Sequence, residues 1–176
     1  MPSFHTYFIS SLPMLFFPGR VPLTFKDFVL SCERFIPEKE VEVIRNASIN
    51  GEYKYPATAG TLRKWQEFDT SLRNELSKIR ASRRHLELSK YLRPQEYSEL
   101  SLGYTAMNIT RNPSPLEVEK NLDLERWRFL EELAFGHYFD LDFLIIYALK
   151  LLILERWELI EHADKEEIIK NILPKF

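Results

Sequence analysis

The residues in this chain that are best suited to chemistry are a histidine and several carboxylates in one short segment. His137, Asp140 and Asp142 lie close together, and Glu131–Glu132 precedes them by one or two helical turns. One imidazole with two carboxylates is a donor set that divalent transition metals accept. Ligands on one helix are expected three or four residues apart, however, and Gly136 interrupts the helix before His137. Because Asp140 also suits a helix N-cap, the pattern favours a structural role, and no metal ligand is assigned.

Two other residues could act in catalysis, and each has a structural interpretation. Lys150 interrupts the apolar stretch Leu141–Leu154. A lysine buried there must pair with a carboxylate or extend to solvent, because an unpaired buried charge is costly. The alternative is that Lys150 acts as a catalytic lysine. Cys32 is the one cysteine and has no histidine near it in the sequence, which favours a structural thiol. No G-x-S-x-G or Gly-rich phosphate loop occurs, so we predict no catalytic residue and no cofactor.

Two Arg-Trp pairs stand near the ends of predicted helices. They lie in Glu125–Arg128 and Glu155–Glu158. Each tryptophan can pack on a core while the arginine beside it reaches a carboxylate, inside the protein or on a partner. One interpretation is a half-buried rim around the core. The other is a contact surface, because tryptophan and arginine are frequent interface anchors. The candidates for a partner interface are Trp127, Arg128, Arg156 and Trp157.

The one basic cluster of the sequence is the segment Arg80–His85. Arg80, Arg83 and Arg84 are either a solvated helix face or a docking surface for an acidic partner. A nucleic-acid partner is disfavoured, because the net charge is −2 and no aromatic residues interleave with the basic ones. These three arginines join the interface candidates.

Apolar spacing predicts an all-α fold, an irregular helical bundle with one long helix. The predicted helices are Phe25–Phe35, Glu38–Ala47, one long helix between Gly60 and Pro94, Pro115–Ala134 with a restart at Asp123, Leu141–Ile160, and Lys165–Leu173 after an Asp164 cap. The segment His5–Ile9 is expected to be a strand or an extended hook. Strands at Val43–Ile49 and Glu52–Tyr55, flanking Asn50-Gly51, are a weaker alternative to helix there.

The chain length suits a single domain over residues 1–176. Sub-lobes 1–92 and 115–176 are expected to be joined by the loop 93–114, which is functional, mobile or partly helical. No apolar stretch is long enough to span a membrane, and no basic region precedes the N-terminal apolar run. The expected location is therefore the cytoplasm.

Several segments resemble an uncharacterised protein family, DUF2764. They are Tyr7–Pro13 (YFISSLP) and Pro22–Phe28 (PLTFKDF) near the start, and Arg126–Glu132 (RWRFLEE), Gly136–Phe143 (GHYFDLDF) and Tyr147–Trp157 (YALKLLILERW) near the end. The resemblance implies a protein encoded in operons of V/A-type ATPases. It also implies a relation to their C subunit (subunit d in eukaryotes), an all-helical adaptor between the central stalk and the membrane ring.

On this resemblance, we expect a non-catalytic accessory or adaptor subunit of a proton- or sodium-translocating V/A-type ATPase. Its partners would be other ATPase subunits of the central stalk or membrane ring, with no nucleic acid and no direct membrane insertion. The protein would be cytoplasmic, or peripheral at the inner membrane through those partners. The alternatives are a helical scaffold of another cytoplasmic complex, and a metal-dependent enzyme that uses His137 and the neighbouring carboxylates.

Overall fold

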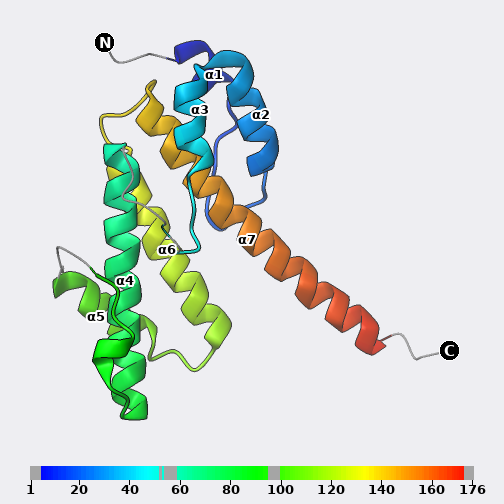
Figure 1. Cartoon of the computed structure of the whole chain (residues 1–176). Helices are drawn as coiled ribbons and strands as arrows, with labels where there is room; N and C mark the ends of the chain where they lie inside the picture. The colour runs from blue at the N-terminus through cyan, green and yellow to red at the C-terminus, as the bar shows by residue number, and fades with distance from the viewer. Residues whose placement is uncertain (1–4, 52, 54–58, 95–99, 173–176) are drawn as a thin grey trace. The chain divides into compact units, whose positions relative to one another are not determined.

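The computed structural model describes residues 5–51, 53, 59–94 and 100–172, without the side chains of residues 100 and 164–172 (Figure 1). Its helices are α1 (Thr6–Ser11), α2 (Phe25–Phe35), α3 (Glu38–Arg45), α4 (Gly60–Arg84), the short 3-10 helix η1 (Leu88–Lys90), α5 (Leu100–Ile109), α6 (Pro115–Leu133) and α7 (Leu141–Ile172). None of the described residues forms a strand, so the predicted all-α fold is confirmed. None of the helices searched is long and apolar enough to cross a membrane.

The chain divides into two compact units. Residues 1–47 and 136–176 form the first, which we call the terminal unit, and residues 48–135 form the second, the central unit. This division differs from the expected sub-lobes 1–92 and 115–176, because α4 and α6 pack against each other in the same unit.

In the terminal unit, α2 and α3 pack on α7, which extends past them (Figure 1). Helix α2 has the predicted bounds, and Thr24 is its N-cap: the Asp27 N–H donates to the Thr24 Oγ1, and that hydroxyl donates to the Asp27 carboxylate. In α7, every residue from Leu144 to Leu149 is buried. A helix that is apolar all round is expected to be buried, and this one supplies much of the core.

Two polar contacts hold the irregular segment 12–24 and the start of α2 against α7. Glu155 on α7 accepts a hydrogen bond from the backbone N–H of Phe25 (2.6 Å), so a carboxylate lies at the positive end of α2. The Tyr147 hydroxyl donates to the carbonyl oxygen of Pro13 (2.8 Å), and its ring packs on Phe28. Burial raises the pKa of Tyr147, so the phenol stays protonated and keeps donating.

The N-terminal segment is helical, and the predicted strand or hook at His5–Ile9 is wrong. Phe8 and Ile9 point into the core from α1, and Phe8 stacks on Phe35. His5 holds the start of α1 in place through two contacts. Its ring Nε2 lies 2.6 Å from a carboxylate oxygen of Glu40, and its backbone N–H donates to the Phe139 carbonyl. Tertiary packing thus overrides the β propensity of the sequence HTYFI.

In the central unit, α4 packs against α5, α6 and η1 (Figure 1). The apolar centre combines Leu72 and Leu76 of α4 with Ala106 of α5 and Leu122 of α6. Beside it, the rings of Phe68 and Phe129 stack with centroids 3.9 Å apart. These contacts lie on the apolar face of α4.

A charged network is buried within this same unit. Asp69 of α4 accepts from Arg126 Nε (2.9 Å) and from Arg73 Nε (2.6 Å), and Arg126 also donates to Asp123 (2.8 Å). Asp69 and Asp123 are fully buried, and Arg126 is only 3% exposed. Burial lowers the pKa of Arg126, but Asp69 and Asp123 raise it by more, so the guanidinium stays charged. The Tyr53 hydroxyl also donates a hydrogen bond to the Asp69 carboxylate.

The long helix ends earlier than predicted. Helix α4 stops at Arg84, and His85 adopts a left-handed conformation (φ 52°) that ends it. The chain then folds back along α4, where the Asn74 side chain exchanges two hydrogen bonds of 2.9 Å with the backbone of Arg93. The expected loop 93–114 is partly helical, as α5 occupies much of it.

The bounds of three other helices can be compared with those predicted from the sequence. Helix α6 runs from Pro115 to Leu133 without the predicted restart at Asp123, because that side chain bonds Arg126 instead. Helix α7 continues to Ile172, so the separate final helix capped by Asp164 is wrong. Helix α3 was predicted correctly to within two residues, and most of the alternative strand Glu52–Tyr55 lies outside the described residues.

The buried network predicts a large effect from one substitution. Arg126→Met removes the cation and leaves Asp69 and Asp123 buried without it. The free energy of unfolding, measured by urea denaturation, should fall by about 3–5 kcal/mol. Arg128→Met is the control, because Arg128 lies on the same helix but is exposed and pairs with Glu125 at the surface. Equal losses in the two variants would contradict this assignment.

Candidate functional site

The histidine and aspartates singled out in the sequence converge at the start of α7. Helix α6 ends at Leu133, and Gly136 then adopts a positive φ (87°) that turns the chain. His137 follows this turn, and Asp140 and Asp142 flank the first residue of α7. The break at Gly136 predicts that these side chains do not form a metal site along one helix. The structure brings the three side chains together across that turn instead.

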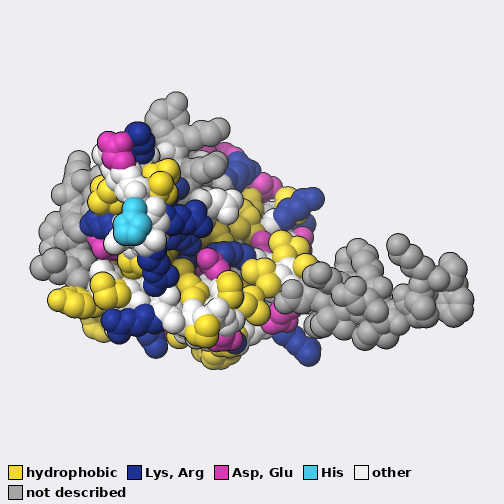
Figure 2. Space-filling view, turned by 90° about the horizontal axis from the view of Figure 1, so that it is seen from below, with side chains coloured by type: hydrophobic (Ala, Val, Ile, Leu, Met, Phe, Trp, Pro, Cys, Tyr) yellow, Lys and Arg dark blue, Asp and Glu magenta, His cyan; other side chains and the backbone are white. Residues whose placement is uncertain are grey.

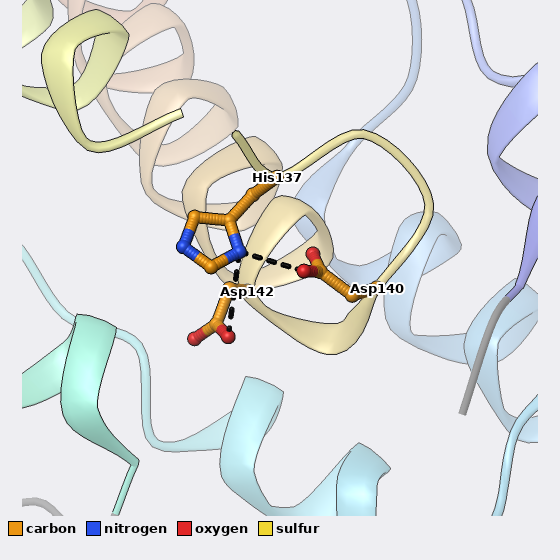
Figure 3. Close-up of side chains that lie close together, drawn as sticks. All are labelled: His137, Asp140 and Asp142. Carbon is orange, nitrogen blue, oxygen red and sulfur yellow. Dashed lines mark hydrogen bonds and ion pairs between the residues drawn. The ribbon is translucent and has the colours of Figure 1, made fainter. Parts of the chain in front are cut away.

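The geometry of this cluster is compact and open to solvent. His137 Nδ1 lies 2.6 Å from Asp140 Oδ2 and 3.7 Å from Asp142 Oδ2. Figure 3 shows this ring nitrogen facing both carboxylates, with the second ring nitrogen on the far side of the ring. The three side chains are 35%, 21% and 34% exposed. One potential ligand atom from each lies within 4.8 Å of the others.

Both aspartates also stabilise the helix on which they lie. Asp140 Oδ1 accepts a hydrogen bond from the Phe143 N–H (3.0 Å), which confirms Asp140 as the N-cap of α7. Asp142 lies in the first turn, where a negative charge favours the helix dipole. Glu131, also considered in the sequence, instead accepts a hydrogen bond from the Trp127 indole.

The basic cluster lies at the C-terminal end of α4. Arg80, Arg83 and Arg84 are all exposed, and Arg83 donates to the Thr110 carbonyl after α5 (3.1 Å). Figure 2 views this end of the molecule and shows lysine and arginine side chains gathered around a histidine. Among the described residues, no carboxylate forms an ion pair with these three arginines. Cations in a last helical turn favour the helix dipole, which accounts for their place in the helix while their charges face solvent.

The two tryptophans among the interface candidates are buried. Trp127 is 4% exposed and donates to Glu131, and Trp157 is 8% exposed and packs edge-on against Phe17. Their burial favours the interpretation as a rim of the core. Of the arginines beside them, Arg128 is exposed and pairs with Glu125, whereas Arg156 is half-buried.

The two remaining reactive residues occupy structural positions. Lys150 is half-buried on α7, and the expectation that it pairs with a carboxylate or extends to solvent stays a prediction. Cys32 is fully buried on the inner face of α2, and burial raises the pKa of its thiol from 9.0 to about 12. A nucleophilic cysteine needs the thiolate, which this environment disfavours, so the structural interpretation of Cys32 gains support.

The structure also exposes apolar side chains that the sequence analysis did not single out. Among the described residues of the terminal unit they are Tyr7, Met14, Phe16, Leu30, Phe35, Tyr138, Phe139 and Leu159. Tyr7 is 80% exposed and its ring lies 6.2 Å from that of Phe35. The signal in the sequence was the density of aromatics in FHTYF and GHYFD, but such runs do not reveal which rings face outward.

Comparison with known proteins bears on the C-terminal part of the chain. Residues 103–176 match the sequence model of DUF2764, described as a protein of unknown function. This match supports the family resemblance seen in the C-terminal motifs. No curated protein and no solved structure matches the chain.

The environment of Cys32 predicts its reactivity. In the folded protein at pH 8, iodoacetamide should alkylate Cys32 far more slowly than in urea, because burial blocks access and the raised pKa keeps the thiol protonated. Mass spectrometry of timed samples measures the rate. Labelling of folded protein as fast as unfolded protein would contradict this burial.

Proposed function

We propose that this protein is a non-catalytic, helical adaptor, an accessory subunit of a V/A-type ATPase that resembles the central-stalk C/d subunit. Its role would be mechanical: a packed helical frame that seats one partner on another. The observation that carries the adaptor role is the set of exposed arginines at the end of α4, whose charges face solvent rather than a carboxylate of the described residues. The ATPase assignment comes from the motif resemblance alone. The DUF2764 match over residues 103–176 supports the family resemblance and names no function.

The arginine surface suits a protein partner with an acidic face. Arg80, Arg83 and Arg84 come from the last two turns of one helix, so their spacing is fixed by the backbone. The hydrogen bond from Arg83 to the Thr110 carbonyl holds one of the three in place. Arginine presents several donors in a planar fork that matches carboxylates. This favours recognition of acidic side chains over diffuse attraction.

The exposed apolar side chains of the terminal unit offer a second contact surface. Large apolar groups gathered at a surface are typical of interaction sites, since water contact with them is unfavourable. Tyr7 and Phe35 lie together there, and both are more than half exposed. An adaptor needs at least two such surfaces, one for each protein that it joins. We assign the arginines to one partner and the aromatics to another, both in the cytoplasm or at the membrane face of the ATPase.

The proposal predicts which proteins associate with the chain. Affinity purification from gently solubilised membranes should recover ATPase subunits of the central stalk or membrane ring. Recovery of a different set of proteins would favour the alternative of a scaffold for another cytoplasmic complex. If no ATPase subunit is recovered while the ATPase itself stays assembled, the proposal is wrong.

Charge reversal tests the arginine surface within that assay. Arg80→Glu with Arg84→Glu should reduce recovery of one partner by about tenfold or more, because each reversal replaces attraction to an acidic surface by repulsion. Arg83 is left unchanged, since it also holds Thr110. The matched control is Arg63→Glu with Lys64→Glu, the same charge change at exposed positions at the other end of α4. If the two double variants recover the partner equally well, the arginine surface is not its binding site.

A further inference from the structure

We propose that His137, Asp140 and Asp142 form a binding site for a divalent transition-metal ion at the start of α7. This proposal is independent of the adaptor function, and neither requires the other. The site uses one nitrogen and two carboxylate oxygens, from the turn before α7, from its N-cap and from its first turn (Figure 3).

The distances leave room for an ion after small side-chain rotations. In a tetrahedral zinc site with bonds of about 2.0–2.1 Å, ligand atoms lie about 3.3 Å apart. His137 Nδ1 is 2.6 Å from Asp140 Oδ2 and 3.7 Å from Asp142 Oδ2, on either side of that value.

The backbone holds two of the three ligands in position before any ion binds. Asp140 Oδ1 is engaged by the Phe143 N–H, which fixes the carboxylate and leaves Oδ2 toward the ring. Asp142 lies in the first turn of a long helix, so its backbone is rigid. Pre-positioned ligands bind more tightly because less side-chain entropy is lost.

The donor set selects the kind of metal. An imidazole nitrogen favours zinc, nickel or similar ions over magnesium and calcium, which prefer oxygen alone. The two carboxylates offset the charge of the ion near the positive end of the helix. Because the three side chains are partly exposed, water can complete the coordination.

Zinc titration of the full-length chain without a polyhistidine tag tests the proposal. Isothermal titration at pH 7.5 should show one site, and cobalt should give a visible absorption band from the same site. His137→Gln and Asp142→Asn should each weaken zinc binding by about tenfold or more. Asp142→Asn keeps the side-chain shape and spares the Asp140 cap, so loss of folding is not a competing explanation.

The control variants are His162→Gln and His85→Gln, which remove exposed histidines outside the cluster. Both should bind zinc as the unmodified chain does. The proposal is overturned if the unmodified chain shows no zinc binding. It is also overturned if each of the two variants, His137→Gln and Asp142→Asn, binds zinc as tightly as the unmodified chain. That result would mean adventitious surface binding only.

Discussion

The central unit depends on one buried arginine held between two buried aspartates. Arg126 of α6 bonds Asp69 of α4 and Asp123 of its own helix, and all three side chains are withdrawn from water. Such a group is stable only when every charge is paired, because the desolvation of each ion must be offset by its neighbours. The pairing therefore fixes how α4 and α6 pack, and Arg73 and Tyr53 extend it to the chain around Ile49.

This constraint has consequences for the surface that we assign to a partner. Gly51, next to that chain segment, has a positive φ (73°), and a side chain there would lie 2.5 Å from Arg73 Nε. Asn74, one turn from Asp69, holds the returning chain at Arg93. The same helix, α4, then carries the three arginines at its end, so the buried network and the exposed charges share one rigid element. Such an arrangement suits an adaptor, because a binding surface on a rigid helix holds its partner in a fixed position.

The sequence predicted the helices well where local signals agree and poorly where tertiary contacts decide. The Thr24 cap and the apolar face of Phe25–Phe35 gave α2 its correct bounds, and Asp140 was correctly predicted as a cap. The α1 segment and the end of α4 were missed, because burial of Phe8 and the left-handed His85 depend on the fold. The pairing of Asp69 with Arg126 joins residues far apart in the chain. No local spacing pattern joins two such residues, so the pair was not predicted.

The central claim is that the Arg126 network holds the central unit together, and amide hydrogen exchange tests it most directly. Arg126→Lys keeps the charge but loses the fork that reaches both aspartates. The account predicts that this variant loses protection in α4 and α6, while α2 and the buried part of α7 keep theirs. Unchanged protection in α4 and α6, or loss confined to the terminal unit, would contradict it.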